Sequence, residues 1–279
     1  KKLGLTALAG SLVVTSAVAG EMSVTGGASI GLKNTTKSAS GKSWTMGNQL
    51  TFSGSGELDN GMNVALSFVI DQADETTETS ARSPFDSHSV TISSDALGTL
   101  VFSGEGGSSA QSAIDTTAAG DLWNNGSGFT APRASEAGDN SMMYTLPTMI
   151  DEVTVKASYS PGGAGGSSAT AWSLGYTGVE GLTLNYAVGE TNTLGSEQDH
   201  TTMKASYAIG SFTVAYSNND YQTAVASKDQ ETTSYKVSYT VSDELSISYG
   251  QEEIVKELDS DDAEFDKISA SYTSGGMTL

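Results

Sequence analysis

The chain has 279 residues, of which 37% are hydrophobic and only 16% charged, and its formal net charge is −20. This balance excludes nucleic acid as a partner, because phosphate binding needs a basic stripe that the chain lacks. It contains 32 glycines and no cysteine, so its stability must come from packing, strand closure or assembly. Glycine, serine and threonine crowd every segment, and helix formers never cluster at helical spacing, which predicts one large all-β domain.

The first 19 residues contain the three parts of a secretory signal. Lys1 and Lys2 precede the apolar run from Leu3 to Val14, and the small residues Ala17-Val18-Ala19 follow. A positive region, an apolar core and a small-x-small site are typical of a cleaved signal peptide. We therefore expect residues 1–19 to be removed and the mature chain, residues 20–279, to leave the cytoplasm.

From residue 21 onward, apolar and small polar residues alternate with a period of two. Met22, Val24 and Ile30 share one face of the first predicted strand, opposite serine and threonine. Such alternation is typical of strands with two different faces. Asn60-Gly61 predicts a tight hairpin before the strand from Met62 to Ile70, because both residues tolerate positive φ.

The alternation continues to the end of the chain, and long connections alternate with short ones. Every strand pair then has one tight end and one elaborated end, which predicts an up-and-down meander. We count about 14 complete strands and the start of a fifteenth at Met277. The predicted long connections are 71–84, 104–140, 161–168, 189–200, 218–231 and 251–264.

A short motif recurs along the second half of the meander. Lysine begins it, serine follows two positions later and tyrosine three positions later, at 156–159, 204–207 and 236–239, with a stretched version from Lys267 to Tyr272. Tyrosine falls on the apolar face, so the period of two puts lysine and serine together on the polar face.

The connection at residues 104–140 has no convincing period of two or 3.6, although clear strand patterns flank it. Loops of this length in compact domains usually have a function of their own or are disordered. A solvated surface flap is the alternative. Its apolar side chains are candidate anchors: Ile114, Leu122, Trp123 and Phe129.

The two faces of the predicted strands favour a membrane barrel over a soluble sandwich. The apolar face carries many aromatic residues, the other face is small and polar, and the chain is exported. In lipid, every backbone N–H and C=O must be paired internally, which a closed barrel achieves. The apolar face then points to lipid, and a barrel of this size encloses water. Because bacterial barrels have even strand numbers, we expect 16 strands, with the last one to two absent from this chain.

Four motifs in order give the chain a family resemblance: Gly20 to Gly26, Asp59 to Met62, Asp95 to Thr99, and the long loop after Phe102. With them the chain resembles a Gram-negative general porin of the alphaproteobacterial type. The resemblance implies a homotrimer of 16-stranded transmembrane β-barrels in the outer membrane, in contact with lipid and lipopolysaccharide. It also implies a water-filled channel for passive diffusion of small hydrophilic solutes and ions. Residues 104–140 would be the inward-folded constriction loop.

The predicted pore has basic residues on the wall and mostly acidic residues on the loop. If the two sets face each other, a transverse field crosses the constriction and orients dipolar solutes. The alternative is that the lysines are solvated in a wide lumen with no acids opposite. The candidate pore residues are Asp115, Asp121, Arg133, Glu136, Lys156, Lys204, Lys236 and Lys267.

The sequence offers no enzyme motif and no strong metal site. No nucleophile, base and orienting group occur together, and His88 and His200 have no further ligand at a useful spacing, so both are interpreted as ordinary polar positions. Residues 259–262 resemble the start of a calcium loop, but Glu264 stands where glycine is required. We expect no cofactor, with solvated acidic outer loops or weak divalent cation binding at them.

Two other functions remain open at this point. One is a substrate-specific outer-membrane channel, which would show saturable conductance with one solute. The other is an exported β-solenoid adhesin or surface protein, which would need no regular alternation of long and short turns and no membrane.

Overall fold

The computed structural model describes residues 22–35, 41–71, 85–114, 117–120, 122, 139–162, 166–193, 196–225, 229–256, 262–274 and 277–278. The chain divides into two compact units, residues 1–106 and 107–279. The predicted signal peptide, residues 1–19, lies outside the described residues. No helix in the described part of the chain is long and apolar enough to cross a membrane.

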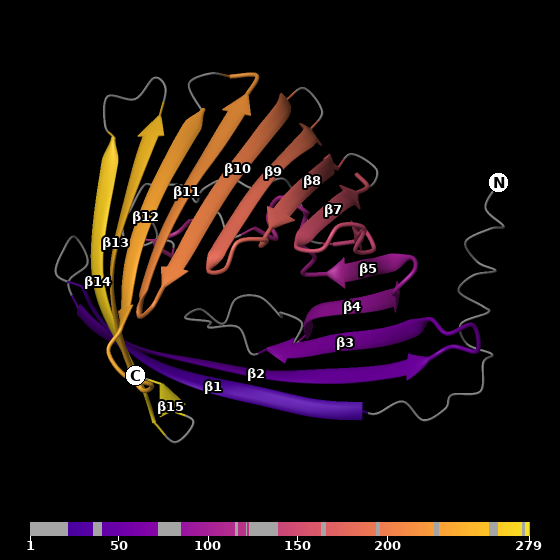
Figure 1. Ribbon diagram of the computed structural model, residues 1–279, viewed down its shortest axis with the longest axis horizontal. Helices are drawn as coiled ribbons and strands as arrows, with labels where there is room; N and C mark the ends of the chain where they lie inside the picture. Colours follow the sequence, from indigo (N-terminus) through magenta and orange to yellow (C-terminus); the bar gives the residue numbers. More distant parts are fainter. Residues whose placement is uncertain are drawn as a thin grey trace. The chain divides into compact units, whose positions relative to one another are not determined.

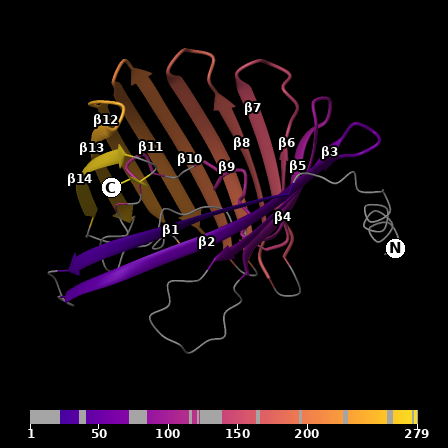
Figure 2. The ribbon, with the colours of Figure 1, turned by 90° about the horizontal axis from the view of Figure 1, so that it is seen from below.

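The first unit consists of five antiparallel strands, each hydrogen-bonded to the next in sequence. Figure 2 shows the longest two, β1 and β2, lying side by side, in register from the pair Met22 and Gly54 to the pair Thr35 and Gly41. The strands are β1 (Met22–Thr35), β2 (Gly41–Glu57), β3 (Asn63–Asp71), β4 (Phe85–Ser94) and β5 (Gly98–Glu105).

The predicted hairpin between β2 and β3 is confirmed. Gly61 has a φ of 78°, a left-handed conformation that glycine adopts without steric cost. The amide of Leu58 donates to the carbonyl of Met62 at 2.7 Å, and the Asn60 side chain accepts from the Met62 amide at 3.1 Å. The turn therefore depends on both residues of the Asn-Gly pair.

The second unit contains the remaining strands, and Figure 1 shows β7 to β14 lying side by side. Its strands are β6 (Ser141–Thr145), β7 (Val153–Ser160), β8 (Ser168–Tyr176), β9 (Leu182–Thr193), β10 (Ser196–Ile209), β11 (Phe212–Thr223), β12 (Gln230–Thr240), β13 (Leu245–Lys256), β14 (Ala263–Ser274) and β15 (Met277–Thr278). All pair antiparallel with their sequence neighbours within the unit. The expected meander of 14 strands, with another beginning at Met277, is confirmed. A sixteenth strand stays a prediction.

Three of the predicted long connections are wrong in their bounds, because the strands continue into them. The structure extends β9 to Thr193, β11 to Thr223 and β13 to Lys256. Along these extensions the second face also becomes polar: Asp220 stands opposite Glu231, and Glu253 opposite Glu264. Hydrophobic alternation ends there although backbone pairing continues, so the sequence pattern underestimates strand length.

The second unit buries its polar face and exposes its apolar face. In β12, the side chains of Tyr235 and Val237 are 49% and 44% exposed, whereas the intervening face holds Thr232 and Ser234 at 0% exposure. A soluble sheet has the opposite arrangement, with its apolar face in the core. The exposed side therefore has the surface expected of a strand that faces lipid.

Aromatic pairs between strands stiffen this exposed face. The ring centroids of Phe212 and Tyr239 are 4.6 Å apart, and those of Tyr216 and Tyr235 are 5.2 Å apart. Tilted aromatic pairs at such distances stabilise neighbouring strands by about 0.5–1.5 kcal/mol beyond burial alone.

Candidate functional site

The inner loop segment, which we define as residues 107–114, 117–120 and 122, lies against the polar face of the strands. The backbone N–H of Ala118 donates to Ser217 Oγ on β11 at 2.9 Å, and that of Ala119 donates to Ser234 Oγ on β12 at 2.8 Å. All four residues are buried. Two successive loop amides are thus held by hydroxyl groups from two neighbouring strands.

The start of the inner loop segment is held by the strands in a similar way. The N–H of Ala110 donates to Ser158 Oγ on β7 at 2.8 Å. The Gln111 side chain donates to Thr202 Oγ1 on β10 at 2.7 Å, and Asn219 donates to the same oxygen at 2.9 Å. The segment therefore has hydrogen-bond partners on four strands, which identifies it as a fixed part of this face.

Apolar contacts accompany these hydrogen bonds. Leu122 is 1% exposed and Ile114 is 8% exposed, so these two predicted anchors are confirmed. Trp123 and Phe129 lie outside the described residues. On β13, a Cβ built at Gly250 would lie 2.9 Å from Ala119 Cβ, closer than real Cβ contacts. Glycine at this position lets the loop backbone approach the sheet.

Two of the four candidate lysines line one cavity beside the inner loop segment. Lys156 on β7 and Lys204 on β10 border a volume of about 370 Å³ that Ile114 also lines. The Lys204 ammonium donates to the Thr117 carbonyl at 3.2 Å. This lysine therefore has two roles, because it lines the cavity and holds the loop.

The other two candidate lysines line a second cavity. Lys236 on β12 and Lys267 on β14 border about 370 Å³ together with Ala119 and Gly120. The period of two in the recurring motif predicted that all four lysines lie on the polar face, and this is the face that the loop contacts. The two ends of residues 113–120 line different cavities, and each cavity contains one lysine pair.

The four charged candidates of the loop, Asp115, Asp121, Arg133 and Glu136, lie outside the described residues. A field between loop acids and wall lysines therefore stays a prediction.

Two titratable residues lie in environments other than those predicted from the sequence. Glu252, expected in an acidic outer loop, lies within β13 opposite Ser234 and is 0% exposed. His200, expected at an ordinary polar position, is 2% exposed, and its ring lies 5.1 Å from that of Tyr221. Both occur on the inner face of extended strands, which the hydrophobic pattern did not reveal. His88 is exposed, as a polar position would be.

The serine partners of the loop were missed by sequence reasoning. Ser158, Ser217 and Ser234 lie on the same polar face as other serines that bind no amide in the described part of the loop, so the local sequence does not distinguish them. One signal was present for Ser158, because it belongs to the recurring motif at 156–159. The related Ser206 and Ser238 line the two lysine cavities.

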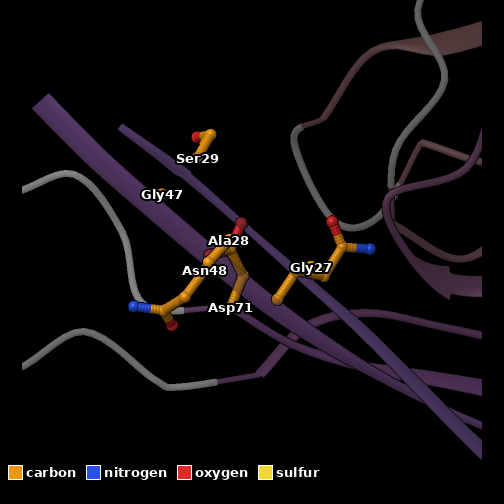
Figure 3. A pocket seen from close by; sticks show the side chains of 7 residues that line it. Gly27, Ala28, Ser29, Gly47, Asn48 and Asp71 are labelled. Carbon is orange, nitrogen blue, oxygen red and sulfur yellow. The ribbon is translucent and has the colours of Figure 1, made fainter. Parts of the chain in front are cut away.

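The first unit contains a polar cavity of its own, of about 440 Å³. Figure 3 shows that its labelled lining residues come from neighbouring strands, with Gly27 and Ser29 on β1, Gly47 and Asn48 on β2, and Asp71 at the end of β3. Asp71 is the acidic residue among them. No group of three or more His, Cys, Asp or Glu in the described part of the chain could hold a metal ion.

Comparison with known proteins gives one family and several structural relatives. A family model for Gram-negative porins matches residues 4–278. No curated protein matches the chain. The loop L8 deletion mutant of the Vibrio cholerae outer membrane protein OmpT is similar over 91% of this chain and 89% of its own, with 15% identity and a TM-score of 0.70.

Two further solved structures have the same fold. Salmonella typhi OmpF, in complex with daunomycin, is 10% identical over 92% of this chain and 87% of its own, with a TM-score of 0.70. An anion-selective porin from Comamonas acidovorans is 17% identical over 91% and 85%, with a TM-score of 0.62. At such low identity these likenesses show the fold alone.

Proposed function

The chain belongs to the Gram-negative porin family, and from this premise we propose how its residues form and narrow a pore. Its fold is the all-β, antiparallel, up-and-down barrel of the outer-membrane porins. Its function is that of an outer-membrane channel for passive diffusion of small solutes. The family consists of channels, and the β-solenoid adhesin has no support.

The observation that carries the proposal is the attachment of the inner loop segment to the polar face. This face bears serine, threonine and lysine side chains and receives loop amides, whereas the opposite face exposes aromatic and aliphatic side chains. A loop held there by backbone hydrogen bonds narrows the lumen without closing it. Residues 104–140 then act as the constriction loop.

The charges that select among solutes lie on the wall and on this loop. We assign the wall contribution to the four lysines of the two cavities. The loop contribution comes from Asp115, Asp121, Arg133 and Glu136. A solute passing between the two sets experiences wall cations on one side and mainly acids on the other, so charge as well as size governs passage. We therefore propose Lys156, Lys204, Lys236 and Lys267 as the pore residues of the wall, which their place in the two cavities supports.

The protein is proposed to act as a homotrimer whose outer face contacts lipid and lipopolysaccharide. A trimer form of OmpT is among the structural relatives. The exposed apolar face supports contact with lipid and with a second subunit, because neither surface requires charged partners.

Single-channel recording in a planar bilayer tests this function. The purified protein should give ohmic steps, with three equal levels for a trimer, because a water-filled lumen conducts in proportion to voltage. The matched sample is the same preparation after heat denaturation, which should be silent. A folded, inserted protein that gives no steps would contradict the channel function. Steps of equal size that never occur in sets of three would contradict the trimer but not the channel function.

A further inference from the structure

The side chains that hold the loop belong to one row across the wall. Strand register sets four residues side by side from β10 to β13, in the order Lys204, Ser217, Ser234 and Glu252. Neighbouring strands lie about 4.8 Å apart, so consecutive members of the row are close neighbours. The row thus brings an ammonium group, two hydroxyls and a carboxylate together on the polar face.

Three successive loop residues follow this row from strand to strand. Thr117 bonds to the lysine on β10, Ala118 to the serine on β11 and Ala119 to the serine on β12. The loop therefore advances by one strand per residue. It also reaches β13, because a Cβ built at Gly250 would lie 2.9 Å from Ala119 Cβ. The member of the row on that strand is Glu252.

Glu252 is completely buried although it lies on the face of a sheet. Its side chain is 0% exposed, and Gly250 and Ile254 on the same face of β13 are buried as well, whereas the intervening Glu253 is exposed. A residue on a sheet face loses all contact with solvent only where another segment covers it. The close approach of Ala119 to β13 identifies the loop as a cover of this part of the strand.

A buried carboxylate needs opposite charges or hydrogen-bond donors around it, because its transfer out of water is costly. Lys236 and Lys267 both pair with Gly250, so each lies diagonal to Glu252 on a neighbouring strand, at about 7–8 Å. The loop supplies donors, because two of its successive N–H groups already face the wall beside this position. Successive N–H groups on one side of a backbone are an arrangement that binds anions.

We propose that Glu252 is a positioning residue of the constriction, which holds the loop on β13 by accepting a hydrogen bond from the loop backbone beyond Ala119. An N–H bonds more strongly to a carboxylate than to a hydroxyl, so Glu252 holds the loop more firmly than either serine of the row does. The inference rests on the proposed channel function and deepens it, because it names a group that regulates how firmly the loop stays in the lumen.

Hydrogen–deuterium exchange of the loop peptide that contains residues 117–122 tests this role in the detergent-solubilised full chain. Glu252→Met keeps the length of the side chain but removes both oxygens. Exchange should become faster by about tenfold or more, which corresponds to about 1.4 kcal/mol and is close to the contribution of a hydrogen bond to a charged group. Glu252→Gln keeps one acceptor oxygen without the charge and should speed exchange only about threefold.

The neighbouring glutamate provides matched controls. Glu253 is exposed on the opposite face of β13, so Glu253→Met and Glu253→Gln remove the same charge one position away from the row. Loop exchange in both controls should equal that of the wild type. Open-channel noise in planar bilayers should increase in Glu252→Met and remain unchanged in Glu253→Met.

The outcomes separate a bond to the loop from packing alone. Loop exchange at the wild-type rate in a folded Glu252→Met channel would overturn the inference and leave the channel function standing. Equal acceleration by Glu252→Gln and Glu252→Met would also overturn it, because the acceptor oxygen would then not be the group that holds the loop. If Glu252→Met does not fold, the glutamine pair decides, and exchange no faster in Glu252→Gln than in Glu253→Gln would overturn the inference. Absence of current from folded, inserted wild-type protein would contradict the channel function instead.

Discussion

The hydrogen bonds from the loop amides to Ser217 and Ser234 should control how long the loop stays on the wall. The double variant Ser217→Ala, Ser234→Ala removes both acceptors from Ala118 and Ala119, whose amides are buried. A hydrogen bond contributes about 1 kcal/mol net, so two contribute about 2 kcal/mol. The equilibrium between the attached and the released loop should therefore shift roughly thirtyfold toward release.

Hydrogen–deuterium exchange of the peptide that contains residues 117–120 measures this shift directly. Exchange in the double variant should be faster by about the same factor, and open-channel current noise should increase. Ser238→Ala is the matched control, because Ser238 lies on the same face of β12 and its hydroxyl accepts no hydrogen bond from the described part of the loop. Unchanged exchange in the double variant, or equal acceleration in the control, would refute the reasoning.

Three further predictions concern the same face. Gly250→Ala should displace the loop near Ala119 and speed hydrogen–deuterium exchange of the loop amides, because the new Cβ would lie 2.9 Å from Ala119 Cβ. Exchange equal to wild type would show that the strand moves and the loop does not. Lys204→Glu with Lys236→Glu should raise cation over anion permeability markedly in reversal-potential measurements, and an unchanged ratio would place these lysines off the ion path. The acidic outer connection 71–78 should bias the mouth toward cations at low salt and lose this bias near physiological ionic strength, where the Debye length is about 8 Å; firm anion preference at low salt would contradict it.

Most of the fold could be predicted because a strand between lipid and water has a strict period of two. The alternation located the strands, and Asn60-Gly61 located a hairpin. The prediction failed where lipid no longer imposes that pattern. Beyond the apolar part of β13, polar residues occupy both faces, and Glu252 was consequently placed in a loop although it is buried in the strand.

The candidate site could be predicted only in part, for a different physical reason. Once a residue is known to belong to a strand, the period of two is enough to tell which face its side chain is on, and this placed Lys156 and Lys204 on the correct face. Which group a side chain contacts, in contrast, depends on how the loop crosses that face, and the loop sequence has no periodicity from which this could be predicted. Nothing in the local sequence of Ser217 or Ser234 indicates that each receives a buried loop amide.

The central claim is that the loop narrows the lumen from within. The most direct measurement is the single-channel conductance of a variant that lacks residues 115–134, compared with the full chain under the same salt and voltage. The account predicts a folded channel with larger conductance, because the deletion removes Ala118 and Ala119, which attach the loop to the polar face, and leaves every described strand intact. A folded variant with unchanged conductance would contradict the account, because it would mean that the loop does not restrict the pore.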